Sequence, residues 1–361
     1  MTTPTTIPSL QRAIIQVDDI GTFGQVYDRP IPIPKPGHVL IKIAAVALNP
    51  CDWKMSSAFP KKGASCGSDF AGCVAQLGEG VTNLAVGDRV AGAVHANNPI
   101  NPASGAYAEY ATVDSQHVWP IPSGMIWGEA ATIGLCGIGS VGMAAWHNLR
   151  LTGTPEAPVE KAPFVLVYGG SSANGTVAIQ LLKLSGYRVV TTCSPHNFKL
   201  VESLGAEKAF DYKSPTCAQD IKTYTSDKLK YVMDIIAEVR TLKLCYEAIG
   251  RAGGRYVGFE LIPEELASLR KTVKASWVLG IRMTGDEIAL GKGYGYPASE
   301  ELYHWGRDLS RRVGEWIRDG KIKAHPQTVH LEGLDGIIEG IEQLRRKEVS
   351  GTKLVYVIDP M

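Results

Sequence analysis

The chain has 361 residues and a formal net charge of +1, with 45% hydrophobic and 20% charged residues. This length exceeds a comfortable single core, so two domains are expected. The balanced charge excludes the basic field of a nucleic-acid-binding protein and a polybasic membrane anchor. Residues 1–10 are predicted to be a flexible polar tail, with no signal peptide and no membrane span. The seven scattered cysteines contain no C-x-x-C pair, which indicates reduced thiols in the cytoplasm.

Short β-rich runs separated by turns fill residues 11–122, namely QRAIIQV, VLIKIAAVAL, GSDFAGCVAQLG, VGDRVAG and GAYAEYATVDSQHVWPIP. The proline-rich stretch PIPIPKPGH between the first two runs cannot donate hydrogen bonds to a strand ladder and predicts an irregular link. Glycines at short intervals between such runs indicate a compact, mostly β domain of the partly open barrel type.

A buried strand, a glycine-rich turn and an amphipathic helix follow one another in residues 164–186, FVLVYGGSSANGTVAIQLLKLSG. A turn of this kind points backbone N–H groups and the helix dipole at a pyrophosphate. Aligned on Gly170 and Gly175, the motif G-x-G-x-x-G has Ser172 at its middle glycine, so the motif by itself is weak.

The downstream sequence repeats the strand and helix alternation in RVVTTC, LVESLGAEKAFDY, YVMDII, TLKLCYEAIG and GGRYVGF. This spacing predicts an α/β, doubly wound parallel sheet of the Rossmann type. A βαβ unit that binds no nucleotide is the alternative interpretation.

The end of the second strand indicates which nucleotide binds. A site for the unphosphorylated cofactor usually has Asp or Glu there to hold the ribose hydroxyls. Here Ser194 and Asn197 precede Lys199, and no acid occurs before Glu202. Hydroxyl and amide donors near a cation accept a 2′-phosphate that a carboxylate would repel, which favours NADPH over NADH. Ordinary helix capping by Ser194 and Asn197 is the alternative.

Residues 129–146, EAATIGLCGIGSVGMAAW, are unusually rich in small residues. Glycine inside a helix costs about 1 kcal/mol, so this many glycines indicate close approach of another group. Tight helix-on-sheet packing is one interpretation of this pattern. Further on, residues 301–319 and GIIEGIEQLRR are predicted to be helices, and KLVYVI a terminal strand.

Taken together, NPCDWK, GSDFAGCV, VGDRV, GAYAEY, the GGSSANGTVAIQLLK turn, LGAEKAFDY, AIGRAGGRYV and EWIRDGKI…SGTKLVYV resemble ordered landmarks of the medium-chain dehydrogenase/reductase superfamily. The SSAN turn, TTCSPHNF and the long loop before Glu300 are most similar to fungal trans-acting enoyl reductases that serve polyketide synthases. The resemblance implies a GroES-like catalytic domain (11–130 and 301–361) with a Rossmann domain (131–300) inserted into it.

The resemblance also implies the site residues. Lys54 is the candidate catalytic residue, toward the cofactor or the developing enolate, with a solvated surface lysine as the alternative. The candidate cofactor-binding residues are Cys51, Asp52, Trp53, Lys54, Ser171, Ser172, Ala173, Asn174, Ser194, Pro195, His196, Asn197, Tyr212, Phe259, Glu260, Ser350 and Gly351. The candidate substrate-binding residues are Gly139, Ser140, Val141, Gly142, Met143, Ala144, Ala145, Trp146, Gly280, Ile281, Arg282, Met283 and Thr284.

No metal is expected. Zinc-dependent relatives carry Cys where this chain has Asn49, and a His-Glu pair where it has Ser68 and Asp69. A stable zinc site needs several thiolate or imidazole ligands. A site assembled from Cys51, Asp69 and a distant histidine is the alternative.

The expected activity is NADPH-dependent reduction of the α,β-double bond of a polyketide intermediate on the acyl carrier protein of a partner synthase. Without zinc, reducing a conjugated C=C needs only hydride delivery and donors toward the enolate oxygen. The glycine-interrupted stretch 277–300 discourages pairing of sheet edges between subunits, so a monomer is expected. The alternatives are a free-standing NADPH-dependent quinone or enone reductase and a non-catalytic NADPH-binding partner protein.

Overall fold

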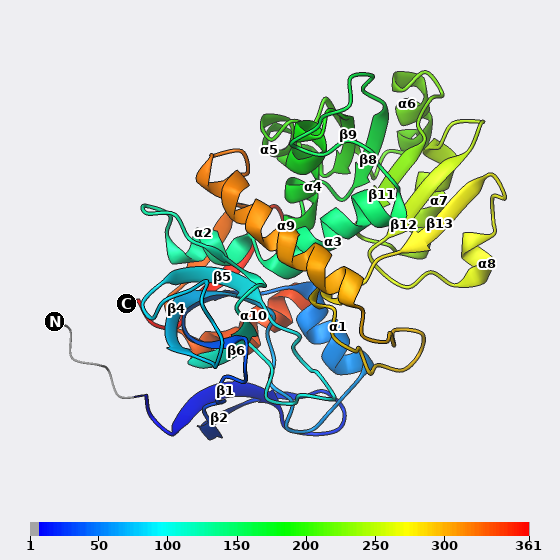
Figure 1. Ribbon diagram of the computed structural model, residues 1–361. Coiled ribbons are helices and arrows are strands. Elements are labelled where there is room, and N and C mark those ends of the chain that lie inside the picture. The colour runs from blue at the N-terminus through cyan, green and yellow to red at the C-terminus, as the bar shows by residue number, and fades with distance from the viewer. Residues whose placement is uncertain (1–6, 361) are drawn as a thin grey trace. The chain divides into compact units, whose positions relative to one another are not determined.

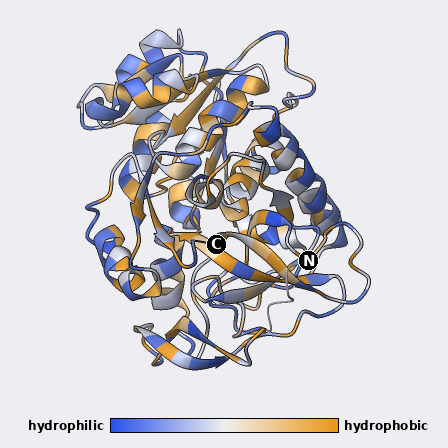
Figure 2. Cartoon of the chain, turned by 90° about the vertical axis from the view of Figure 1, so that its left-hand side faces the viewer, coloured by the Kyte–Doolittle hydropathy of each residue, from blue (hydrophilic) through white to orange (hydrophobic). Residues whose placement is uncertain are grey.

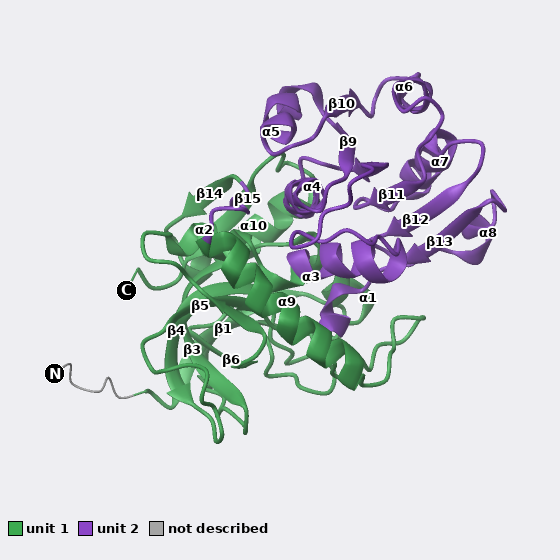
Figure 3. Ribbon diagram, turned by 45° about the horizontal axis from the view of Figure 1, so that its top comes forward, with its two compact units in different colours: residues 1–136, 284–318, 326–361 green, residues 137–283, 319–325 purple. Residues whose placement is uncertain are grey.

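The structure, a computed structural model, describes residues 7–360 of the chain. The chain divides into two compact units, coloured separately in Figure 3. Unit 1 contains the chain up to Cys136, Thr284–Arg318 and the chain from Pro326 on, and unit 2 contains Gly137–Met283 and Asp319–His325. The domain bounds expected from the sequence, at 131 and 300, stay a prediction.

Unit 1 is built mainly of antiparallel strands, labelled in Figure 1. β1 (Leu10–Gln16) and β2 (Phe23–Pro30) form a hairpin sheet. A larger sheet has the order β14-β15-β3-β4-β5-β7, with β6 paired to β3. Its strands are β3 (His38–Ala47), β4 (Asp69–Leu77), β5 (Arg89–Ala93), β6 (Tyr110–Asp114), β7 (Val118–Pro120), β14 (Gln327–His330) and β15 (Lys353–Val357).

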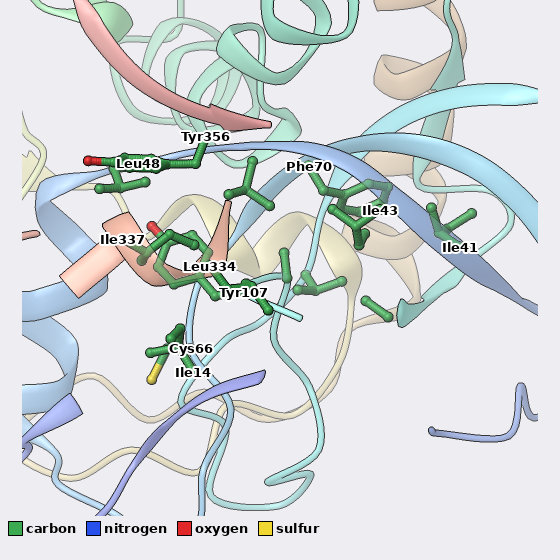
Figure 4. Close-up of a cluster of buried hydrophobic side chains, with 14 of the residues drawn as sticks. Ile14, Ile41, Ile43, Leu48, Cys66, Phe70, Tyr107, Leu334, Ile337 and Tyr356 are labelled. Atoms are coloured by element: carbon green, nitrogen blue, oxygen red, sulfur yellow. The ribbon is translucent and has the colours of Figure 1, made fainter. Parts of the chain in front are cut away.

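The helices of unit 1 are α1 (Pro50–Ala58), α2 (Trp127–Thr132), α9 (Glu300–Arg318) and α10 (Leu334–Arg345). α10 buries Leu334, Ile337 and Ile341, which recur at helical spacing and form one apolar stripe. All three belong to one hydrophobic core with Ile43 of β3 and Tyr356 of β15, and Figure 4 shows Leu334 and Ile337 in that core. The core holds the starts of α1, β4 and β15 in one unit.

Unit 2 is a six-stranded parallel sheet with the order β10-β9-β8-β11-β12-β13. Its strands are β8 (Phe164–Tyr168), β9 (Arg188–Cys193), β10 (Lys208–Asp211), β11 (Tyr231–Asp234), β12 (Gly254–Gly258) and β13 (Val273–Trp277). β8 is buried along its whole length, as a central strand covered on both faces must be. In Figure 2 such strands carry the hydrophobic colour while the helices are mixed. This strand order is the doubly wound order, and the predicted α/β fold class is confirmed.

The helices of unit 2 follow its strands, together with the long segment that enters the unit. They are α3 (Leu135–Met143), which begins in unit 1, the π-helical turn η1 (Ala144–Asn148), α4 (Ala173–Leu184), η2 (Pro195–Asn197), α5 (Phe198–Ser203), α6 (Cys217–Tyr224), α7 (Val239–Ala248), α8 (Glu264–Ala267) and η3 (Gly280–Thr284). β2, β13, β14, η1 and the helices α1, α6 and α8 are among the elements that the sequence patterns did not predict. The three strands all lie at or near sheet edges, where half-exposed residues obscure the apolar alternation.

One stretch, Trp127–Asn148, is long and apolar enough to cross a membrane by length and composition, with a mean hydropathy of 1.2. However, 83% of it is buried inside the structure, as in the core helix of a folded domain. The predicted tail, residues 1–10, lies mostly outside the described residues.

Candidate active site

The chain turns sharply between β8 and α4, and we call Gly169–Gly175 the dinucleotide turn. Gly169 has φ of 87°, in the left-handed region that glycine adopts without strain. A Cβ at Gly175 would collide with the carbonyl oxygen of Gly169, so the helix and the turn pack backbone against backbone. The N–H groups and the positive dipole end of α4 therefore open at the carboxyl end of β8, where a sheet of this order binds nucleotides.

Ser172 stands at the place of the motif's middle glycine and has a definite structural role. Its backbone is extended, with φ of −75°, so no glycine is needed for conformation. Its hydroxyl donates to the carbonyl of Gly169 at 2.7 Å and accepts from the N–H of Gly175 at 3.1 Å. Ser172 is thus the N-cap of α4, and Ser171, Ala173 and Asn174 flank it in the turn and the first helical turn.

The end of β9 leads into η2, which holds the candidate residues Pro195, His196 and Asn197. Neither Ser194 nor Asn197 forms a side-chain capping bond with the helix that follows it, although each stands at an N-cap position. Instead, the Ser194 hydroxyl donates to the Tyr212 hydroxyl at 3.4 Å. The capping alternative considered for these two side chains is therefore not realised.

Two cations lie around the ring of Tyr212, which follows β10. The Lys213 ammonium is 5.9 Å and the Arg240 guanidinium carbon 5.7 Å from the ring centroid. Arg240 lies at the start of α7, after β11, which follows β10 in the chain but is separated from it in the sheet by β9 and β8. The carboxyl ends of β9, β10 and β11 thus place an aromatic ring, a hydroxyl and positive charge together in unit 2.

The candidate acyl residues of unit 2 come from two segments that touch. Gly139–Met143 lie on α3, Ala144–Trp146 on η1, and Gly280–Thr284 form η3. A Cβ at Gly139 would collide with the sulfur of Met283, so α3 and η3 are in direct contact. A Cβ at Gly137 would lie 2.6 Å from the Asn174 amide oxygen, which places α3 beside the dinucleotide turn. The Trp146 indole donates to the carbonyl of Gly153 at 3.0 Å, and Phe259 and Glu260 follow β12.

In unit 1 the NPCDWK segment forms the start of α1. Asn49 is the N-cap, and its backbone N–H donates to the Asp52 carboxylate at 2.7 Å. That carboxylate also accepts from the Tyr107 hydroxyl at 2.6 Å and the Ser68 hydroxyl at 3.3 Å. Asp52 is buried, Cys51 and Trp53 are half-buried, and Lys54 is exposed.

Burial dominates the acid–base behaviour of this segment. It raises the pKa of the Asp52 carboxyl to about 6, against the hydrogen bonds from Tyr107 and Asn49, which favour the charged form. Burial also raises the pKa of the Cys51 thiol well above its ordinary value and that of Cys136 to about 12. Both thiols therefore stay protonated near neutral pH, which removes them as nucleophiles there.

A buried ion pair lies next to this segment. The Lys353 ammonium is 2.8 Å from Asp69 Oδ2, and the two side chains are 6% and 1% exposed. The same oxygen accepts from the Asn49 side-chain amide at 2.8 Å. A side chain at Gly134 would collide with the Asp69 carboxylate. We call Asn49, Asp52, Asp69, Tyr107 and Lys353 the buried polar network. The candidates Ser350 and Gly351 precede its lysine, with Thr352 between Gly351 and Lys353.

These side chains do not fit a zinc ion. Asp69 faces two hydrogen-bond donors, the Lys353 ammonium and the Asn49 amide, where a metal would need lone pairs. In residues 7–360 no group of three His, Cys, Asp or Glu side chains is placed to hold a metal. The alternative of Cys51, Asp69 and a histidine is thus not formed there, and no chemical step is assigned to a metal.

The structure brings several sequence candidates together within each unit. In unit 2 these are Ser194 with Tyr212 and Gly139 with Met283, and in unit 1 residues 51–54, which share the helix α1. Sequence reasoning missed Arg240, Tyr107 and Lys353 as members of these clusters. Arg240 could have been predicted as a member, because it follows the fourth strand of the Rossmann sheet. The sequence around Tyr107 and Lys353 does not indicate that their partners are Asp52 and Asp69.

Comparison with known proteins agrees with this architecture. Residues 35–123 match the family model described as alcohol dehydrogenase GroES-like domain, and residues 174–289 match zinc-binding dehydrogenase. The solved structure of the CurK enoyl reductase superposes with a TM-score of 0.74 at 18% identity, covering 96% of this chain and 99% of that one. This likeness concerns the fold.

Curated relatives match over nearly the whole chain. The trans-enoyl reductase mycC of Thermothelomyces thermophilus is 54% identical, with 98% of both chains covered. The trans-enoyl reductase gkaC of Penicillium citrinum is 50% identical, covering 97% of this chain and 98% of the relative. Identity at this level and coverage, on a Rossmann sheet and a GroES-like unit, shows that the chain belongs to the trans-enoyl reductases of the medium-chain dehydrogenase/reductase superfamily, a superfamily of pyridine-nucleotide-dependent oxidoreductases.

Proposed function

We propose that the protein uses NADPH to reduce the α,β-double bond of an acyl intermediate carried by the acyl carrier protein of a separate polyketide synthase. The choice of nucleotide rests on one observation, the chemistry at the end of β9. No carboxylate follows that strand before Glu202, while Lys213 and Arg240 bring positive charge to Tyr212. Such a place attracts a 2′-phosphate and gives no acceptor to the free ribose hydroxyls of NADH.

Residues of unit 2 hold the proposed nucleotide. The N–H groups at the start of α4 take the pyrophosphate, and Ser172 keeps them aligned by capping that helix. Ser194, Tyr212 and Arg240 take the ribose phosphate and the adenine edge. When bound, the nicotinamide supplies the hydride for the β-carbon of the substrate.

The proposed acyl site lies along Gly139–Trp146 and η3. The Met283 side chain of η3 packs directly against Gly139 of α3, so the two segments that would line the acyl chain are in contact. Lys54, exposed at the start of α1, is the proposed donor toward the enolate oxygen or the nucleotide.

The relatives support a carrier-bound substrate, because they are named trans-enoyl reductases and the match covers nearly their whole length. We test it with crotonyl thioester on a pantetheine arm, the same group on a carrier protein, a quinone and a simple ketone, and follow oxidation of NADPH. Reduction of the thioesters, best on the carrier protein, is expected. Reduction of the quinone alone would instead establish the free-standing reductase, and binding of NADPH without any turnover the non-catalytic role.

The nucleotide choice is tested separately by comparing kcat/KM for NADPH and NADH. We expect Arg240→Met and Ser194→Asp each to lower the NADPH preference about tenfold or more, Ser194→Asp also by raising the use of NADH. Arg251→Met is the matched control, because Arg251 lies on the surface of unit 2 in an exposed pair with Asp227. An unchanged ratio in both test variants would contradict the NADPH site described here.

A further inference from the structure

The pair of Lys353 and Asp69 joins segments that are far apart in the sequence. Lys353 begins β15, Asp69 begins β4, and Asn49 caps α1, yet one carboxylate oxygen accepts from both other side chains at 2.8 Å. The Asn49 backbone in turn donates to Asp52. The ammonium is therefore connected, through two carboxylates and one asparagine, to the turn that carries Cys51–Lys54.

Stability alone is a poor explanation for this pair. Removing two charges from water costs several kcal/mol per ion, and apolar residues of similar volume often stabilise a protein as well or better. The cost here is increased because Asp69 Oδ1 is buried and has no hydrogen-bond partner among the described residues. The backbone at Gly134 leaves no room for a side chain on that face. The carboxylate is held in one place at an energetic cost.

In this protein the only positive charge in contact with Asp69 within the described residues is the ammonium of Lys353.

Building on the proposed function, we propose that Lys353 is a positioning residue for the reductase reaction. Through Asp69 and Asn49, its ammonium holds the 49–54 turn in the geometry that the reaction requires. Its own backbone fixes the neighbouring turn Ser350–Gly351. Lys353 acts through these residues and does not itself touch the reacting atoms.

The test is a neutral double variant, Lys353→Met with Asp69→Asn, which leaves no buried charge unpaired and keeps an acceptor for Asn49. Its matched control is Lys42→Met with Asp359→Asn, a Lys–Asp pair of the same unit at 2.6 Å whose side chains are 34% and 36% exposed. For each protein we measure kcat and KM for the enoyl thioester and NADPH, and amide hydrogen exchange over residues 49–54.

We expect the neutral double variant to fold, to exchange the 49–54 amides faster and to lose about tenfold or more in kcat, while the control keeps wild-type values. A folded double variant with wild-type kcat and exchange would overturn the proposal. Lys353→Arg, which keeps the charge, is expected to retain kcat within about threefold, and it decides the question if the double variant does not fold. In that case, a folded arginine variant with wild-type amide exchange over residues 49–54 and kcat within about threefold of wild type supports the proposal. A folded arginine variant with faster exchange and a larger loss of kcat overturns it.

Failure of this proposal and failure of the proposed function are separable. If the wild-type protein reduces no enoyl thioester, the function proposed above is wrong. The exchange comparison between the two double variants then still decides whether Lys353 holds the 49–54 turn.

Discussion

In unit 2 the dinucleotide turn obtains most of its conformation from residues adjacent in sequence, whereas in unit 1 the buried polar network joins residues up to 284 positions apart. The turn depends on glycine conformation, a serine cap and close backbone packing within seven residues, and its first two N–H groups donate to Thr192 of the adjacent strand β9. The network depends on three strands or helices arriving together. A closely packed turn of this kind is destabilised by an added side chain. A buried network is destabilised when one of its members is removed.

The sharpest way to break the network is to remove one charge. Lys353→Met leaves Asp69 buried without its counter-ion, so we expect a loss of about 3–5 kcal/mol in the free energy of unfolding. Chemical denaturation measures it. Lys42→Met, in the exposed pair with Asp359, should cost about 1 kcal/mol or less. Equal losses in the two variants would mean that burial of the pair has no energetic consequence.

The second effect concerns Asp52 and pH. Burial raises the pKa of Asp52 to about 6 in the folded protein from 3.8, so the folded state binds more protons between these values. This contribution to stability is present at low pH and is lost as pH rises from about 4 to 6, in total roughly 3 kcal/mol.

Asp52→Asn should remove that part of the pH dependence. Denaturation of both proteins across this range should show a stability curve for the variant that falls less steeply with rising pH. Parallel curves would show that Asp52 does not titrate differently in the folded and unfolded states. This experiment tests whether burial of Asp52 in the unit 1 network lowers stability as pH rises.

In unit 2 the largest expected effect follows Gly175→Ala. The added methyl group meets the backbone of Gly169 and Gly170, which cannot move aside as a side chain can, and we expect a loss of about 1–3 kcal/mol together with weaker NADPH binding. Gly291→Ala is the control, because its Cβ meets nothing within 4 Å. Thermal unfolding and NADPH fluorescence titration give the two readouts, and a variant that matches the control would show that the turn is looser than described.

The smallest effect distinguishes the two roles of the serine in the turn. Ser172→Ala removes the cap of α4 and should cost about 1 kcal/mol, whereas Ser172→Gly restores the motif's glycine and should cost only a few tenths. Denaturation of the two variants side by side checks this order. The reverse order would contradict the capping role assigned to Ser172.

The contrast also explains which elements could be predicted. β8, α4 and the alternation that follows them were predicted because central parallel strands are continuous apolar runs and helices carry an apolar stripe. β13 and β14 were not predicted, because edge strands expose many residues and their pattern carries little apolar alternation. The assigned roles of the site residues stay predictions for the experiments above.

By itself, the sequence determined the α/β class, the dinucleotide turn and the lack of an acid after β9, because each is encoded by neighbouring residues through backbone conformation and hydrophobic periodicity. Only the tertiary structure decided that Asn49, Asp69 and Lys353 share one carboxylate oxygen, that Arg240 lies by Tyr212, and that Met283 packs on Gly139. Contacts of this kind depend on how whole elements pack against one another. The sequence around a charged or small residue does not indicate which distant residue it will contact.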